Sequence, residues 1–177
     1  LPDAEPAPLA ITPARQLIAD NPELRPVLIH GLLRQGETLE LIAAPKIGKS
    51  HLVGMLSLAA ATGSNWLGRL ITKTRVLIID NELHRETIAG RLRKLATHTG
   101  DFDALDGIDV LSLRGHLISI EELAHRIPTG IYGLIILDSF YRFLAAGKSL
   151  VDENDNSAMT DTFNLIDRLA MRSDAAI

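Results

Sequence analysis

Hydrophobic residues along the chain form short continuous runs separated by segments of helical periodicity. Residues 39–44, 75–80 and 131–138 have the length and character of buried strands, and residues 108–113 form a weaker one. Continuous apolar strands that alternate with helices are typical of a parallel sheet covered on both faces. The pattern therefore predicts an α/β fold with three layers, in which helices cover both faces of a mostly parallel sheet.

Helix signals fill the intervals between these runs. Thr12-Pro13 marks a helix start and Asn21-Pro22 follows its end, after which residues 27–33 are interpreted as a connector. Residues 52–61 are apolar nearly all round, which predicts a buried helix. Further helices are predicted at residues 86–98, after the capping box Ser119-x-x-Glu122, and at residues 157–172, with Gly63 and Gly100 as stops and Trp66 in the core.

Residues 37–50, E-T-L-E-L-I-A-A-P-K-I-G-K-S, join a predicted strand to a predicted helix through Gly48-Lys49-Ser50. A strand, a tight turn with this tripeptide and a helix are the context of a phosphate-binding P-loop. The loop amides and the positive end of the helix dipole attract an anion. Lys49 is then expected to reach the outer phosphates of ATP, and the Ser50 hydroxyl to bind Mg²⁺.

The motif departs from the usual pattern at one position, where Ala43 replaces the first glycine. A small residue still allows the turn, so we treat the departure as minor. A second tripeptide, Gly147-Lys148-Ser149, has Arg142 at the corresponding position and is followed by polar and acidic residues. It lacks the strand and helix context, and we expect a loop there.

Two acids stand at or just past the carboxyl ends of predicted strands, where ligands of parallel sheets collect. Asp138 closes an apolar run, as a Walker B acid does, and its carboxylate suits Mg²⁺. Glu82 follows Asp80 at another strand end and is expected to orient and polarise the attacking water. A capping Asp138 and a solvated surface Glu82 are the alternatives, and Asp80 is expected to have a structural role.

These stretches together resemble the RecA-type ATPase core, on the residues 43–50, Ile79-Asp80-Asn81-Glu82 and 134–139. The lead-in Gly31-Leu32-Leu33 and residues 61–68, 140–144 and 152–154 resemble the branch of RepA-type hexameric replicative helicases. The resemblance implies catalytic roles for Glu82 and Lys49 and a metal site at Ser50 and Asp138. It implies nucleotide contacts from Ala43, Ala44, Pro45, Lys46, Ile47, Gly48, Lys49, Ser50 and His51.

The same resemblance implies a homo-oligomeric ring, possibly a hexamer, with ATP between subunits and single-stranded DNA held by local loops. The formal charge of −4 gives no global basic field to support DNA binding. Residues 145–156, where such proteins often touch DNA, contain Lys148 but also Asp152, Glu153 and Asp155, which suit phosphate poorly. Three alternatives remain open. The protein could be a nucleotide-switched regulator, a recombination-type ATPase without unwinding activity, or a non-catalytic oligomerisation module in which ATP only stabilises the assembly.

Composition and motifs also limit the cellular compartment and the kinds of site that we expect. Cysteine is absent, which fits a reducing compartment, and no run is long enough to span a membrane, so a cytoplasmic protein is expected. No histidine spacing indicates zinc, and no G-x-S-x-G elbow indicates a serine hydrolase. We expect a flexible leader at residues 1–12 and an ATPase core at 13–177. The first residue is Leu and the last three resemble the start of a strand, so we expect a piece of a longer chain.

Overall fold

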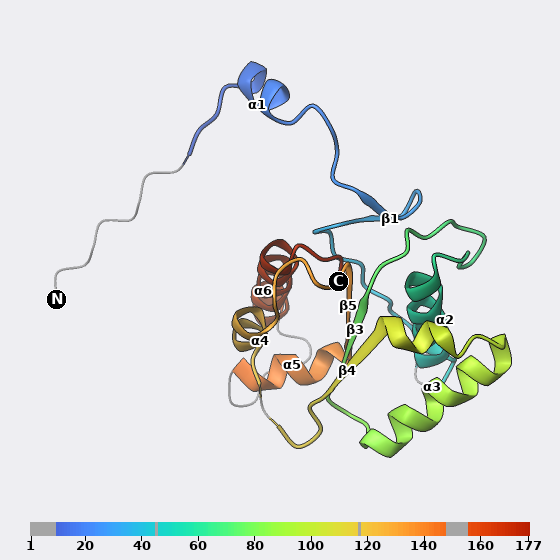
Figure 1. Ribbon diagram of the computed structural model, residues 1–177. Coiled ribbons are helices and arrows are strands. Elements are labelled where there is room, and N and C mark those ends of the chain that lie inside the picture. The colour runs from blue at the N-terminus through green and yellow to red at the C-terminus, as the bar shows by residue number, and fades with distance from the viewer. Residues whose placement is uncertain (1–9, 45, 117, 148–155) are drawn as a thin grey trace.

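A computed structural model describes residues 10–44, 46–116, 118–147 and 156–177 (Figure 1). Several expectations lie wholly or mainly outside these ranges: the first part of the leader, Pro45, the second Gly-Lys-Ser tripeptide beyond Gly147, and the acidic loop as far as residue 155.

The central sheet contains β3 (Val76–Asp80), β4 (Ile108–Ser112) and β5 (Leu134–Asp138), in the order β4-β3-β5. Both pairings are parallel. Asp80, the last residue of β3, lies in register with Ser112 on one side and with Asp138 on the other. The predicted parallel sheet is confirmed for these strands, and the residues that follow them meet at one edge.

Helices cover both faces of this sheet, as predicted (Figure 1). One face carries α2 (Lys49–Thr62) and α3 (Arg85–Thr99), and the other carries α4 (Ile120–Arg126) and α6 (Asn156–Ser173). The short α5 (Phe140–Gly147) follows β5, and the 3-10 helix η1 (Asp103–Gly107) precedes β4. The predicted cap of α4 is present, because the Ser119 hydroxyl accepts a hydrogen bond from the Glu122 amide.

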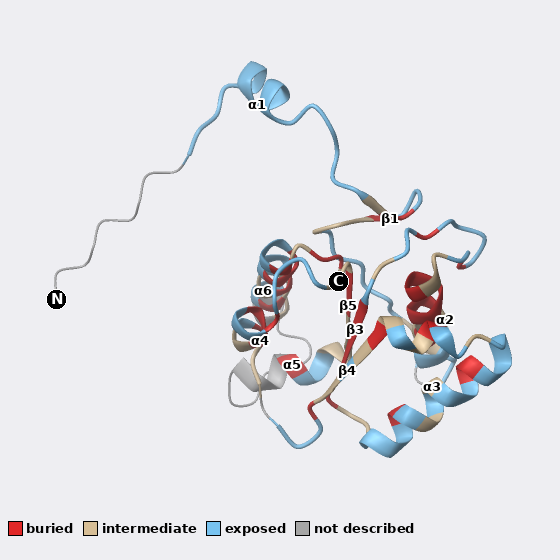
Figure 2. Cartoon of the chain, viewed as in Figure 1, coloured by how far each residue is buried: buried red, intermediate tan, exposed pale blue. Residues whose placement is uncertain are grey.

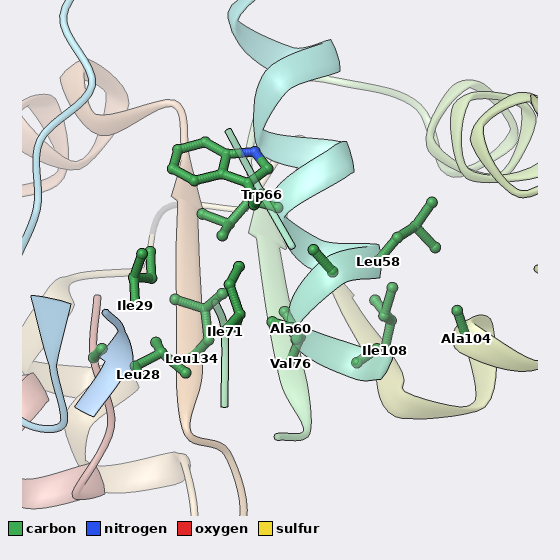
Figure 3. Packing of buried hydrophobic residues seen from close by; sticks show 14 of the residues in the cluster. Leu28, Ile29, Leu58, Ala60, Trp66, Ile71, Val76, Ala104, Ile108 and Leu134 are labelled. Atoms are coloured by element: carbon green, nitrogen blue, oxygen red, sulfur yellow. The ribbon is translucent and has the colours of Figure 1, made fainter. Parts of the chain in front are cut away.

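Alternate residues of β3 face opposite layers. Val76 and Ile78 belong to the apolar cluster that contains α2, whereas Leu77 and Ile79 belong to the cluster with α4 and α6. Every residue of β3 is buried, which explains its continuous apolar run (Figure 2). Trp66 packs in the first cluster, and its indole N–H donates to the Leu52 carbonyl of α2, so its predicted core role is confirmed (Figure 3).

The region before the P-loop differs from expectation in its details. Residues 27–34 form an antiparallel pair, β1 (Val27–Ile29) with β2 (Leu33–Arg34), where we predicted a connector. The first helix, α1 (Ala14–Asp20), begins after Pro13 rather than after a Thr12 cap. It has no buried residue and stands apart from the sheet and its covering helices (Figures 1 and 2).

The strand predicted at residues 39–44 is wrong. Leu41 and Ile42 are 43% and 81% exposed, and no strand is assigned between β2 and α2 within the described residues. The segment makes sheet-like bonds only at its start, where the Leu39 amide donates to the carbonyl of Ile177 and the Ile177 amide donates to that of Glu37. Ala176 in turn forms a parallel bridge with Leu134 of β5. A strand requires a continuous ladder of backbone partners, and within the described residues this segment has a backbone partner only at Ile177.

Candidate active site

The turn at the start of α2 has the backbone conformation that a glycine allows. Gly48 occupies the N-cap position with φ = 100°. Most side chains are strained at this φ, and a glycine has no side chain to cap the helix. The first intrahelical bond runs from the Leu52 amide to the Gly48 carbonyl. The amides of the first helical turn therefore have no partner in the helix and are free to face an anion.

Lys49 folds back onto the loop that precedes it. Its ammonium group donates to the Ala43 carbonyl over 2.6 Å, so the side chain spans the turn from the helix to the end of the preceding segment. Lys46, inside the loop, has φ = 64°, an uncommon conformation for a residue with a side chain. Such strain often marks a ligand-binding turn.

A pocket of about 680 Å³ opens beside this loop. Lys49, Ser50 and Asp138 are among the polar residues that line it, and Ala43 also contributes to the wall. The rest of the wall is mostly apolar. It comes from β2 and the residues between β2 and α2, from α2 and the turn that contains Trp66, from β5, and from the helices α5 and α6. The structure therefore brings Lys49 and Ser50 to the same cavity as Asp138, the acid that ends β5, although Ser50 and Asp138 are 88 positions apart (138 − 50) in the sequence.

Asp138 is partly buried in an acidic environment. Burial raises the pKa of its carboxyl above the ordinary value, and the negative charges of Asp80 and Glu82 raise it further. The positive charges of Arg91 and Lys49 act in the opposite direction without cancelling the rise. A cation beside Asp138 would offset the repulsion that now opposes its ionisation.

Asp80 has a structural role in the turn after β3. Its carboxylate accepts hydrogen bonds from the amides of Glu82 and Leu83, over 2.9 and 2.7 Å. Asn81 joins this turn to the end of β5, because its side-chain oxygen accepts from the Ser139 amide and its side-chain nitrogen donates to the Ser139 carbonyl. The half-buried Glu82 is thus carried on a turn fastened to both β3 and β5.

Glu82 is not part of the pocket wall, although it lies at the same edge of the sheet. The other loop residues that we singled out, Ala44, Lys46, Ile47 and Gly48, are exposed and also lie outside the wall, as does His51 in the first turn of α2. The cavity therefore unites Ala43, Lys49, Ser50 and Asp138, and Glu82 stands one strand away.

Sequence reasoning missed two arginines that contact the turn of Glu82. Arg114 follows β4 and donates to the Glu82 carbonyl, and Arg142 of α5 donates to the Asn81 carbonyl over 3.3 Å. The pKa of Arg142 is raised chiefly by its hydrogen bond to the Tyr141 hydroxyl, with smaller contributions from the charges of Glu82 and Asp80. The sequence feature that could have identified them is their position, because each arginine follows a strand that ends at this edge of the sheet.

Comparison with known proteins gives one family. A family model described as an AAA domain matches residues 3–177. The search of curated proteins found no match to the chain. Among the described residues, no helix combines the length and the apolar character that crossing a membrane requires.

Proposed function

We propose, from the premise that the chain belongs to the AAA domain family of P-loop ATPases, that it binds Mg·ATP and hydrolyses it. The observation that carries this proposal is the shared pocket of Lys49, Ser50 and Asp138. A lysine, a hydroxyl and a carboxylate, beside amides that have no partner within the helix, are the groups that a triphosphate and its metal ion require.

The residues of the pocket fit Mg²⁺. Ser50 and Asp138 offer oxygen ligands, which this ion prefers, and a cation would relieve the repulsion around the partly buried Asp138 carboxylate. When bound, the metal ion would supply charge neutralisation at the phosphates. Lys49 exchanges its bond to the Ala43 carbonyl for a phosphate oxygen and stabilises the negative charge that develops there.

Glu82 is proposed to orient and polarise the attacking water. For this role Glu82 must reach the side of the γ-phosphate that faces away from the loop. It stands on the turn that follows β3, the strand adjacent to the one that carries Asp138. Because Glu82 is half-buried and stands on a turn held by side-chain hydrogen bonds, its position is constrained. Hydrolysis of a triphosphate depends mainly on such positioning, with one group to direct water.

Phosphate release from ATP tests this proposal. The assay compares the protein in Mg²⁺ with the protein in excess EDTA, and wild type with Lys49→Ala. We expect release that needs both the metal ion and Lys49. Release that continues unchanged in EDTA or in the variant would refute the assignment of the pocket.

We further propose that the ATPase drives a DNA-processing motor of the helicase kind, assembled as a ring. The support is the resemblance of residues 61–68 and 140–144 to RepA-type helicases. Stimulation of phosphate release by single-stranded DNA, together with ATP-dependent separation of a labelled duplex, is the expected result. ATPase activity that DNA leaves unchanged would favour a regulator, and ATP binding without phosphate release would favour an oligomerisation module.

A further inference from the structure

The turn that carries Glu82 lies outside regular secondary structure. β3 ends at Asp80 and α3 begins at Arg85, so Asn81 and Glu82 lie in neither a strand nor a helix. Backbone N–H and C=O groups in such a position need other partners. The Asn81 amide donates to the Asp138 carbonyl over 3.0 Å, and the Glu82 amide donates to the Asp80 carboxylate.

The two carbonyls of the turn are held by arginines. The Asn81 carbonyl accepts from Arg142, and the Glu82 carbonyl accepts from Arg114. Arg114 follows β4 and Arg142 follows β5, which are the two neighbours of β3 in the sheet. The arginines therefore reach the turn from the segments after both flanking strands, and all four backbone groups of Asn81 and Glu82 have a partner.

We propose that Arg114 and Arg142 are positioning residues that hold the backbone of Glu82 in the orientation needed to direct water, an inference that depends on the hydrolytic role proposed for Glu82. Hydrogen bonds from a charged donor are stronger than neutral ones, and the planar guanidinium presents several N–H groups at fixed angles. A displacement of about 1 Å in a reacting group can lower a rate by roughly 100-fold.

The positioning role is separable from folding. Both guanidinium side chains are exposed, so truncation opens no cavity in the core. The turn also keeps its other fastenings, which are the Asp80 carboxylate, the Asn81 side chain on Ser139 and the bond from the Leu113 amide to the Asp80 carbonyl. Removing the arginines should therefore leave the turn in place while increasing the freedom of Glu82.

The test measures kcat for Mg·ATP and the affinity for a non-hydrolysable ATP analogue in R114A, R142A and the double variant. The control is R93A, which removes an exposed arginine from α3. We expect kcat to fall about 10- to 100-fold in the double variant with analogue affinity and melting temperature unchanged. R114K, which retains a donor, should recover part of the loss from R114A, and R93A should match wild type.

A mutant cycle that combines E82Q with the arginine variants separates this inference from the proposed function. If the arginines act through Glu82, adding R114A and R142A to E82Q should slow hydrolysis no further. A double arginine variant that hydrolyses ATP at the wild-type rate beside a slow E82Q would overturn the positioning role alone. Parallel losses of kcat, analogue affinity and melting temperature would also overturn it, since they indicate a structural role. E82Q at the wild-type rate would instead refute the function proposed for Glu82.

Discussion

Asp138 lies directly beside Asp80 in the parallel register of β5 and β3, so two carboxylates meet at the edge of the sheet where the pocket opens. The pKa of Asp138 is raised by burial first and by the charges of Asp80 and Glu82 second. Ionisation of Asp138 is therefore opposed in the folded protein, and a cation bound at the proposed metal site would offset that effect.

Asp138→Asn is expected to stabilise the nucleotide-free protein. A raised folded-state pKa means that the folded protein holds this proton more tightly than the unfolded chain, so stability falls as pH rises from the ordinary carboxyl pKa through the raised one. The variant should therefore melt up to a few degrees higher at pH 7, since about 1 kcal/mol corresponds to roughly 2–4 °C in a domain of this size.

The difference in melting temperature between Asp138→Asn and wild type should shrink as pH falls from the raised pKa of Asp138 to the ordinary carboxyl pKa. In Mg·ATP the difference should reverse, because this ligand should stabilise only the wild type strongly. Asp109→Asn is a control for which we expect the opposite effect on stability. The pKa of Asp109 is lowered, chiefly by its hydrogen bond from Arg75, so loss of this exposed pair should destabilise the protein slightly at neutral pH. Thermal melts across the pH range provide the measurement. Equal melting temperatures for Asp138→Asn and wild type at every pH would contradict the account.

Glu82→Gln is expected to slow hydrolysis about 100-fold or more while ATP still binds, because the amide cannot accept a proton from water. Single-turnover phosphate release gives the rate, and equilibrium binding gives the affinity. Glu86→Gln is a matched control, since Glu86 is an exposed carboxylate in the first turn of α3. Wild-type turnover in Glu82→Gln would return Glu82 to the role of a surface acid.

Trp66→Ala is expected to destabilise the fold by about 3–5 kcal/mol, the range for removal of a large aromatic side chain from a core. Trp66 is 9% exposed, whereas its neighbour Leu67 is 68% exposed. Leu67→Ala should therefore change stability by no more than about 0.5 kcal/mol. Urea unfolding followed by circular dichroism measures both, because Trp66→Ala removes the chain's single tryptophan. Similar midpoints for the two variants would contradict the packing described here.

The strands and helices whose patterns reflect burial were predictable from sequence. β3 is buried along its whole length and its residues are continuously apolar, and α3 ends at Gly100, which has φ = 72°. Residues 39–44 show the limit of such patterns. They are as apolar as a strand, yet a strand also needs a neighbour, and the described residues provide one only at Ile177.

Residues that line the candidate pocket could be singled out from sequence where their pattern is local. Gly48-Lys49-Ser50 is a contiguous motif, and Asp138 closes an apolar run. Arg114 and Arg142 were not predictable in the same way, because each donates a hydrogen bond to a backbone carbonyl of another segment. Every residue has a backbone carbonyl, so the sequence does not indicate which one accepts such a bond. Only the order β4-β3-β5 places these two arginines around Glu82.

Titration of the protein with a fluorescent ATP analogue in Mg²⁺ tests the central claim most directly, with Lys49→Ala and the exposed control Lys94→Ala measured alongside. Loss of Lys49 removes the cation that is expected to leave the Ala43 carbonyl for a phosphate. We predict saturable binding that unlabelled ATP displaces, retained in Lys94→Ala and reduced at least about tenfold in affinity in Lys49→Ala, as for loss of a charged hydrogen bond. Absence of saturable binding in the wild type, or equal affinity in Lys49→Ala, would contradict the account.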